Sequence, residues 1–374
     1  MHKAYIGVDG VAKAVKKGYI GVDNVARRIK KAYIGIGGVA RPCWSGKEVA
    51  YYGTITDLSE ARDNLSATTV GGYALFGGGH SNSYTSTVDA YDNSLTRSTP
   101  TPLIERRDTL AATTVGSYAL FGGGIYSWGD TSTKYDCVDA YDESLTRTNP
   151  TDLIYPRSEL SATTVGDYAL FAGGGGGIYV DAYNKSLTRS SPKNLNAALY
   201  SMSATTVGDY ALFGGGRGDG YVSSVVFAYD KSLTQTLPSE FSVTRYNLAA
   251  TAVGDYALFG GGRQASDLNH SQSTVETYDN HLTKIATTDL SAARCFLAAT
   301  SIGGYGLFAG GLTTQDSAIV DAYDESLTKT NPTPLAQARH SYAATSVGGF
   351  ALFGGGKSNS SNSRLATVEA YTVL

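Results

Sequence analysis

Six arginines recur at one position of a repeated pattern in this chain, and a carboxylate recurs with them. Each arginine stands eight residues before the last Val or Ile of a stretch rich in Ala, Ser and Thr: Arg62, Arg107, Arg157, Arg245, Arg294 and Arg339. The acid is the second residue of each later VDAYD-like stretch: Asp89, Asp139, Asp181, Glu276, Asp321 and Glu369. Arginine and carboxylate together can form a buried ion pair, whereas arginine alone can bind an acidic ligand at the surface.

One repeat lacks both groups, and this joint loss favours the ion pair. It carries Leu199 at the arginine position and Phe227 at the acid position. We therefore interpret the arginines as structural before ligand-binding, paired with the acid of the same repeat. If such a pair is buried, removal of one partner costs about 3–5 kcal/mol.

The spacings of the other reactive residues match no catalytic or metal-binding pattern. The histidines His2, His80, His270, His281 and His340 have no metal-ligand spacing, and Cys43, Cys137 and Cys295 form neither a disulfide framework nor a zinc pattern. Cys295 and His340 each follow a repeat arginine, but no third group is recognisable to orient them. The glycine triplets resemble phosphate loops without the helix or the lysine that those loops need. We expect no catalytic residue, metal or cofactor.

The repeated elements that must position these residues are short and strand-like. The phrase YALFGGG, or a close variant, begins at Tyr73, Tyr118, Tyr168, Tyr210, Tyr256, Tyr305 and Phe350. Each repeat has four pieces, which in the first are LSATTV (65–70), YALFGGG (73–79), VDAYD (88–92) and a stretch after an SLT turn (94–103). Four antiparallel strands in each unit of this length predict an all-β fold, a β-propeller.

The two ends of the repeat array predict how the propeller closes. The last repeat ends at VEAYTVL with only three of its four strands. Upstream of the first repeat, VAYYGTITDLSEAR (49–62) aligns with SLTRSTPTPLIERR (94–107). An N-terminal strand would then complete the last sheet and leave no free edge. Residues 49–374 are thus predicted to form seven blades closed by strand exchange.

The repeat resembles a known family. PLIERRDTLAATTVGSYALFGGG (102–124) is similar to the kelch repeat in its arginine, its glycine pair and the tyrosine of the third strand, and the resemblance covers residues 49–374. It implies that the arginines lie at the channel mouth, where some kelch proteins bind acidic peptides. Kelch repeats carry Trp six residues after the tyrosine. Here Arg97, Arg147, Arg189, Gln235, Lys284 and Lys329 replace it, which implies a more polar outer packing.

A basic arm precedes the repeats. Residues 3–44 read KAYIGVDGVAKAVK, KGYIGVDNVARRIK and KAYIGIGGVARPCW, three units of fourteen residues. The turn pairs Asp9-Gly10, Asp23-Asn24 and Gly37-Gly38 predict three hairpins within an arm of residues 1–48. Nine Lys/Arg against two Asp give residues 1–44 a charge of +7, so the remainder carries −10. The arm is expected to dock or self-associate through Tyr5, Tyr19, Tyr33, Lys17 and Lys31. No nucleic-acid-binding module is recognisable.

The arm resembles repeats of virion and tail proteins of phages and prophages from Gram-positive bacteria. That resemblance implies a virion structural protein that is made in the bacterial cytoplasm. No apolar run reaches the eighteen or so residues of a membrane span, and MHKAYIGVDG lacks the apolar core of a secretory signal. A virion, or otherwise the cytoplasm, is the expected location.

The segments between the glycines and the third strand vary most from repeat to repeat, and they are rich in aromatic residues. They carry Tyr84, Tyr126, Trp128, Tyr135, Tyr179 and Tyr221. Variable aromatic loops on a fixed scaffold can bind sugar rings or a protein, although they can also be ordinary surface variation.

We therefore expect a non-enzymatic virion adaptor, part of a tail, a baseplate or the particle surface. It would dock through its arm to other virion proteins or copies of itself, and present its loops to a host surface glycan or protein. The sequence leaves two alternatives open. One is a cellular interaction hub that holds an acidic peptide at the arginines, and the other is a glycan-binding propeller.

Overall fold

The computed structural model describes residues 47–175, 177–361 and 363–374 in full, together with the backbone of six strands within residues 5–45. The chain divides into two compact units. One comprises Met1–Ala50 with Val373–Leu374, and the other comprises Tyr51–Thr372.

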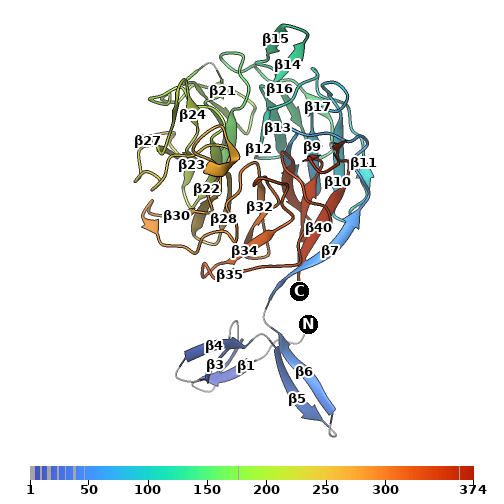
Figure 1. Cartoon of the computed structure of the whole chain (residues 1–374), viewed down its shortest axis with the longest axis vertical. Coiled ribbons are helices and arrows are strands. Elements are labelled where there is room, and N and C mark those ends of the chain that lie inside the picture. Colours follow the sequence, from blue (N-terminus) through green and yellow to red (C-terminus); the bar gives the residue numbers. More distant parts are fainter. Residues whose placement is uncertain are drawn as a thin grey trace. The chain divides into compact units, whose positions relative to one another are not determined.

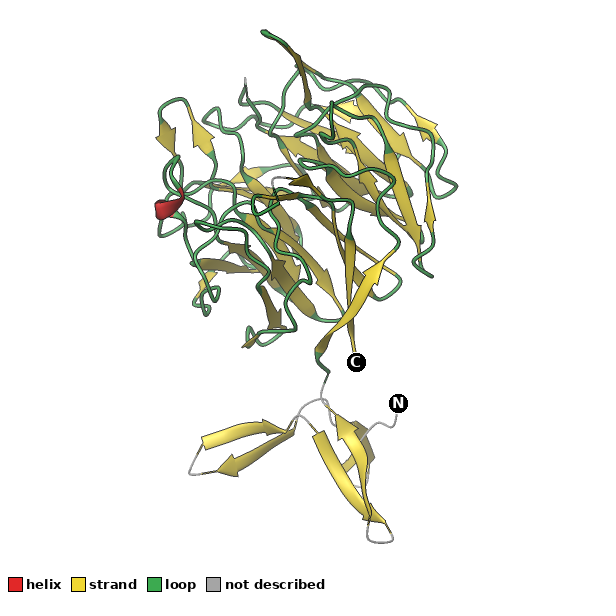
Figure 2. Cartoon of the chain, turned by 45° about the vertical axis from the view of Figure 1, so that its right-hand side comes forward, coloured by secondary structure: helices red, strands yellow, loops and turns green. Residues whose placement is uncertain are grey.

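The second unit is a seven-bladed β-propeller built from seven four-stranded antiparallel sheets (Figures 1 and 2). The innermost strands are β8 (Ser66–Val70), β12 (Ala111–Val115), β18 (Ser161–Val165), β22 (Ser203–Val207), β28 (Ala249–Val253), β32 (Ala298–Ile302) and β36 (Ala343–Val347). The second strands are β9 (Tyr73–Gly77), β13 (Tyr118–Gly122), β19 (Tyr168–Ala172), β23 (Tyr210–Gly214), β29 (Tyr256–Gly260), β33 (Tyr305–Ala309) and β37 (Phe350–Gly354). The predicted fold class is confirmed.

The outer half of each blade follows the predicted order of strands. The third strands are β10 (Val88–Asp92), β16 (Val138–Tyr141), β20 (Val180–Asn184), β26 (Val226–Asp230), β30 (Val275–Asp279), β34 (Val320–Asp324) and β40 (Val368–Val373). The outermost strands are β11 (Arg97–Ser98), β17 (Arg147–Thr148), β21 (Arg189–Ser190), β27 (Gln235–Thr236), β31 (Lys284–Ile285), β35 (Lys329–Thr330) and β7 (Val49–Ile55). Blades are numbered 1 to 7 in chain order of their innermost strands.

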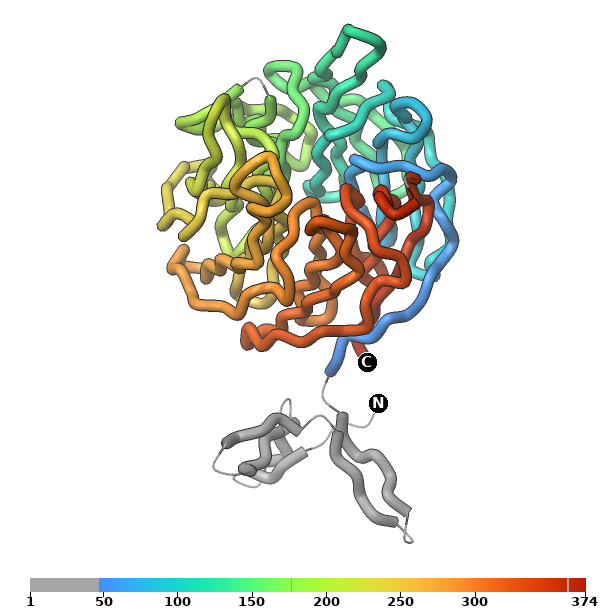
Figure 3. Tube along the Cα trace, viewed as in Figure 1, coloured from blue at the N-terminus to red at the C-terminus, as the bar shows by residue number. Residues whose placement is uncertain are grey.

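Strand exchange closes the ring. The sheet of blade 7 has the order β36-β37-β40-β7, so the strand that precedes blade 1 in the chain is the outermost strand of blade 7. In Figure 3 the red C-terminal segment lies beside the blue segment that contains β7. The innermost strands contact one another in succession, and β36 contacts β8. No blade edge is therefore left open at this seam.

Glycines at the end of the second strand let neighbouring blades approach closely. An added Cβ at Gly122 would lie 2.9 Å from the ring of Phe171 in the next blade. Gly123 has a φ of 67°, and a Cβ there would lie 2.5 Å from the carbonyl oxygen of Arg157. Any larger residue would push the two blades apart.

The core lies between the blades. Val70, Leu75 and Leu103 of blade 1 and its flanking loop pack against Phe121 and Tyr141 of blade 2, and all of them are buried. The Tyr141 hydroxyl donates a hydrogen bond to the carbonyl oxygen of Thr101 across the boundary at 2.7 Å. The third-strand tyrosines of the other six blades make the same kind of bond. Polar and apolar contacts thus repeat at each boundary.

The segments between the second and third strands contain short additional elements. Among the described residues, three blades carry a hairpin there: β14 (Ile125–Trp128) with β15 (Thr131–Lys134), β24 (Arg217–Gly218) with β25 (Tyr221–Val222), and β38 (Lys357–Ser358) with β39 (Ser363–Arg364). Blade 5 carries a single 3-10 turn, η1 (Leu268–His270), which is drawn red in Figure 2. No helix in the described part of the chain has the length and apolar character to cross a membrane.

The N-terminal unit contains three separate two-stranded antiparallel sheets, as the fourteen-residue repeat predicts. They are β1 (Tyr5–Val8) with β2 (Val11–Ala14), β3 (Gly18–Val22) with β4 (Val25–Ile29), and β5 (Lys31–Ile36) with β6 (Val39–Ser45). The predicted turn pairs and Lys17 lie outside the described residues, as do the side chains of Tyr5, Tyr19, Tyr33 and Lys31.

Candidate functional site

The six repeat arginines are buried inside the blades. Their side chains are at most 1% exposed. Five of them form the expected ion pair within their own blade: Arg62–Asp89 at 2.8 Å, Arg107–Asp139 at 2.6 Å, Arg157–Asp181 at 2.7 Å, Arg294–Asp321 at 2.5 Å and Arg339–Glu369 at 2.6 Å. In blade 4 the replacements Leu199 and Phe227 both belong to one buried hydrophobic cluster.

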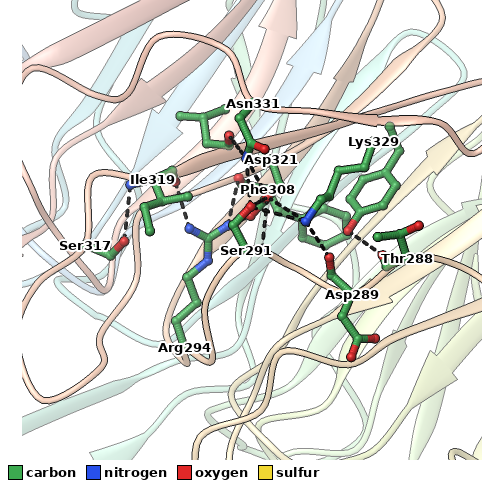
Figure 4. A network of polar contacts seen from close by, with 12 residues as sticks. Thr288, Asp289, Ser291, Arg294, Phe308, Ser317, Ile319, Asp321, Lys329 and Asn331 are labelled. Atoms are coloured by element: carbon green, nitrogen blue, oxygen red, sulfur yellow. Dashed lines mark hydrogen bonds and ion pairs between the residues drawn. The ribbon is translucent and has the colours of Figure 1, made fainter. Parts of the chain in front are cut away.

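Figure 4 shows this network in blade 6. Arg294 donates to the carbonyl oxygens of Ile319 at 2.9 Å and Phe308 at 3.2 Å, in addition to its bond with Asp321. The second carboxylate oxygen of Asp321 accepts hydrogen bonds from the backbone and side chain of Ser291 and from Asn331. Both buried charges are therefore paired and hydrogen-bonded, which is the condition for burying them without a large penalty.

A second cation approaches the same carboxylate from the outermost strand. These cations are the residues at the kelch tryptophan position: Arg97, Arg147, Arg189, Lys284 and Lys329 lie 3.5, 3.6, 2.8, 2.7 and 3.7 Å from the acid of their blade. Blade 4 has Gln235 instead, which donates to the Tyr229 hydroxyl at 2.7 Å. Blade 4 has thus lost the arginine, the acid and the outer cation together.

Blade 5 departs from the predicted pairing. Glu276 pairs with Lys284 at 2.7 Å and accepts a hydrogen bond from Ser242. It does not form the short ion pair with the repeat arginine, Arg245, that five other blades have. The Phe241 ring centroid instead lies 4.5 Å from the Arg245 guanidinium carbon. Burial lowers the pKa of Arg245 to about 10, because the nearby Glu276 charge offsets only part of the lost hydration.

A closed ring of main-chain hydrogen bonds joins the seven loops that precede the innermost strands. The residues are Asn64, Thr109, Glu159, Ser201, Asn247, Phe296 and Ser341, one from each blade, and we call them the collar. Each N–H donates to the carbonyl oxygen of the preceding collar residue at 2.9–3.1 Å, and the Asn64 N–H donates to Ser341 to close the ring. All seven have φ between 49° and 56°, an uncommon region for residues other than glycine.

The collar surrounds a cavity of about 590 Å³. All seven collar residues line it, so it must lie on the axis of the propeller. None of the six repeat arginines lines it. Because solvent does not reach those arginines, a ligand in this cavity would not touch them.

Two other arginines line the cavity, and both lie over aromatic rings. The Arg217 guanidinium carbon lies 5.9 and 5.5 Å from the ring centroids of Tyr200 and Tyr246. The Arg263 guanidinium carbon lies 4.8 Å from the centroids of both Tyr246 and Phe296. Across blades 4 to 6, aromatic rings and cations thus alternate in one series, which we call the cationic ladder.

Blades 1 to 3 contribute acids near the collar. Asp63 and Asp108 are each 6% exposed, and Glu159 is exposed and lines the cavity. Burial raises the pKa of Asp108 to about 6, and the nearby negative charges of Asp63 and Glu159 act in the same direction. Asp63 accepts a hydrogen bond from Arg364 of blade 7 at 2.7 Å. The two sides of the collar therefore differ in charge.

A second cavity, of about 360 Å³, adjoins the ladder. Arg217 and Tyr246 line both cavities, and the predicted loop residue Tyr221 lines the second one and is 47% exposed. Tyr84, Tyr126, Trp128, Tyr135 and Tyr179 line neither cavity. Trp128 is 72% exposed on the β14–β15 hairpin. The Tyr179 ring stacks on Tyr155, with centroids 4.2 Å apart.

The sequence contains a signal for the ladder, namely two variable positions beside the repeated motifs, that a search for the shared pattern of the repeats does not detect. The residue after each glycine triplet or its equivalent varies from blade to blade: His80, Ile125, Gly175, Arg217, Arg263, Leu312 and Lys357. So does the residue after the arginine position: Asp63, Asp108, Ser158, Tyr200, Tyr246, Cys295 and His340. Isolated bridges pair the two positions in six blades, including Tyr200 with Arg217 and Tyr246 with Arg263. Their variability within an almost constant repeat marks them as candidates.

The remaining chemical candidates form no recognisable centre. Burial raises the pKa of Cys137 to about 11 and also raises the pKa of Cys295, which favours the unreactive thiol. His340 Nδ1 lies 2.7 Å from Asp316 Oδ1. Among the fully described residues, no three His, Cys, Asp or Glu side chains gather as metal ligands would.

Comparisons with known proteins support the fold only. A solved structure of YjhT superposes with a TM-score of 0.59 at 12% sequence identity, and the match covers 75% of this chain and 99% of that chain. At this identity the likeness shows a shared fold and nothing about activity. No protein-family model matches the chain. No curated protein sequence matches it either.

Proposed function

We propose that this chain is a non-enzymatic adaptor of a phage or prophage virion. Its arm would attach it to other virion proteins, and its propeller would present a binding face centred on the collar. The observation that carries the binding role is the contrast between a nearly constant, buried framework and a collar whose neighbouring residues vary among the blades. Proteins commonly place recognition on variable loops held by such a rigid scaffold.

The attachment role rests on the resemblance of the arm to phage virion and tail repeats, and on its distinct composition. The hairpins form a separate compact unit, and residues 1–44 carry nine of the thirty Lys/Arg of the chain. Two-stranded hairpins of this size bury little surface alone, so they favour association with a partner or with other copies. The kelch-like character of the blades remains part of this proposal.

The alternative of a hub that holds an acidic peptide at the six repeat arginines receives no support from their burial. The glycan-binding alternative draws on Trp128, whose exposed indole could stack on a sugar ring. Retention on immobilised host-surface glycans, compared between the native chain and Trp128→Ala, tests that alternative.

Mass spectrometry of density-purified particles tests the adaptor directly. We expect the chain to co-purify with capsid or tail proteins in a fixed ratio, and a copy that lacks residues 1–46 to be absent from particles. A matched copy with an intact arm and Arg217→Gln should still be incorporated. A chain that is abundant in the lysate but missing from particles would overturn the adaptor.

A further inference from the structure

We infer that Arg217 anchors an oxyanion, a carboxylate or a phosphate ester, on a small ligand that occupies the collar cavity. The inference deepens the proposed binding role and rests on it, but it does not depend on attachment to a virion. Four features of the molecule lead to it.

First, Arg217 stands apart from the other arginines near the channel. The repeat arginines Arg294 and Arg339 bond carboxylates, and Arg364 bonds Asp63. Arg217 is half-buried, and within the described residues its guanidinium has neither a carboxylate partner nor a hydrogen-bond acceptor. A partly dehydrated cation without an anion leaves favourable interaction energy for an incoming one.

Second, the aromatic neighbours of Arg217 leave its hydrogen-bond donors available. Tyr200 and Tyr246 provide aromatic surfaces to the guanidinium. Aromatic rings accept none of the five N–H groups of a guanidinium as a carboxylate would, so these donors remain available to an acceptor in the cavity. Carboxylate and phosphate oxygens match this planar fork with two parallel hydrogen bonds.

Third, a second cation stands next in the series. Arg263 donates to the carbonyl oxygen of Ser266 at 2.8 Å, whereas its buried Nε has no partner in the described structure. Both arginines line the cavity, and Glu159 lines it from blade 3. This arrangement would direct the anionic end of a ligand toward blades 4 and 5, and its neutral, hydrogen-bonding end toward the rest of the collar.

Fourth, the space and lining suit a small polar ligand. The collar cavity of about 590 Å³ lies within the usual range for small-molecule sites. Asn64, Thr109 and Ser201 add small uncharged polar groups to its wall. Arg217 also borders the second cavity, of about 360 Å³, so a ligand bound at this residue can extend in either direction.

Arginine labelling of the native chain tests the inference without any substitution. Phenylglyoxal modification of Arg217 is followed by peptide mass spectrometry at low ionic strength, alone or with glycerol, glycerate or glycerol 3-phosphate. These probes share a carbon skeleton and differ in charge. At least one anion should slow Arg217 labelling severalfold while glycerol does not, and the exposed Arg106 should label at the same rate throughout. The more protective anion distinguishes a carboxylate from a phosphate ligand.

Isothermal titration calorimetry with the more protective anion then assigns the contact. We expect Arg217→Gln to weaken binding on the order of tenfold, the loss of one charged hydrogen-bonded contact, and Arg217→Lys to weaken it less. Arg106→Gln is the matched control and should bind like the native chain. Equal labelling of Arg217 under all conditions, equal protection by glycerol, or unchanged affinity in Arg217→Gln would each overturn the inference. Absence from particles would refute the adaptor and leave these results unaffected.

Discussion

We predict that the buried ion pair of blade 6 can be replaced by the apolar pair that blade 4 carries at the equivalent positions. We consider Arg294→Leu, Asp321→Phe and the double variant, which together copy Leu199 and Phe227 into blade 6. Arg294 and Asp321 are both fully buried and 2.5 Å apart, so each single change leaves a buried charge without its main partner. Each single variant should lose about 3–5 kcal/mol of unfolding free energy.

The contacts around the pair refine this expectation. In Arg294→Leu, the Asp321 carboxylate keeps its bonds from Ser291 and Asn331, so the loss should fall near about 3 kcal/mol. In Asp321→Phe, Arg294 keeps only carbonyl acceptors, so the loss should fall near about 5 kcal/mol. The double variant removes both buried charges. Its cost of about 1–3 kcal/mol should come from packing defects and from the Ser291 and Asn331 donors that lose Asp321 as their acceptor.

The double-mutant cycle therefore predicts a coupling of about 5–7 kcal/mol, far beyond what independent sites show. Unfolding in guanidinium chloride, followed by the near-ultraviolet circular dichroism of the buried tyrosines, measures this coupling energy. Trp44 and Trp128 belong to hairpins, so tryptophan fluorescence would report on those instead. Equal slopes of free energy against denaturant are needed for the comparison. A double variant that loses the sum of the two single losses would refute the idea that the pair acts as one exchangeable unit.

Two further predictions concern the collar and the seam. Because the pKa of Asp108 is about 6 in the folded chain and about 4 when unfolded, its contribution to stability is complete below pH 4 and is lost as the pH rises through 6. The free energy of unfolding of Asp108→Asn, relative to that of the native chain, should therefore rise by up to about 3 kcal/mol between pH 4 and pH 8. A constant difference between the two chains across that range would contradict this. Deletion of residues 1–46 should leave the melting temperature of the propeller unchanged, whereas deletion of residues 1–55 removes β7 and should lower it and promote association at the exposed β40 edge. Thermal melts with size-exclusion chromatography check both deletions, and equal behaviour of the two would argue against closure by strand exchange.

Repetition made the framework predictable from sequence. Seven copies of one strand phrase fixed the number of blades, and the alignment of residues 49–62 with 94–107 revealed the shared last blade. The joint loss of arginine and acid in blade 4 indicated the buried pair. Each of these inferences compares equivalent positions, which is information that a repeat protein carries within one chain.

The departures depend on neighbours that the repeat does not specify. Arg245 lacks the short ion pair because its guanidinium lies over the Phe241 ring, while Glu276 pairs with Lys284. The cationic ladder was missed because its members come from three blades and meet only through the geometry of the ring. Sequence reasoning within one repeat could not bring Tyr246 beside both Arg217 and Arg263.

The collar also has a consequence for how this protein can change over time. Its seven residues close the ring through main-chain hydrogen bonds, and the side-chain bond from the Ser201 hydroxyl to the Glu159 carboxylate is not part of that closure. Amide, hydroxyl, carboxylate and aromatic side chains already occupy equivalent places, which shows how broad the tolerance is. Only proline would remove a donor from the ring. Point mutations can therefore change the lining of the cavity while the scaffold stays intact, which makes the collar a natural starting point for engineering binding specificities.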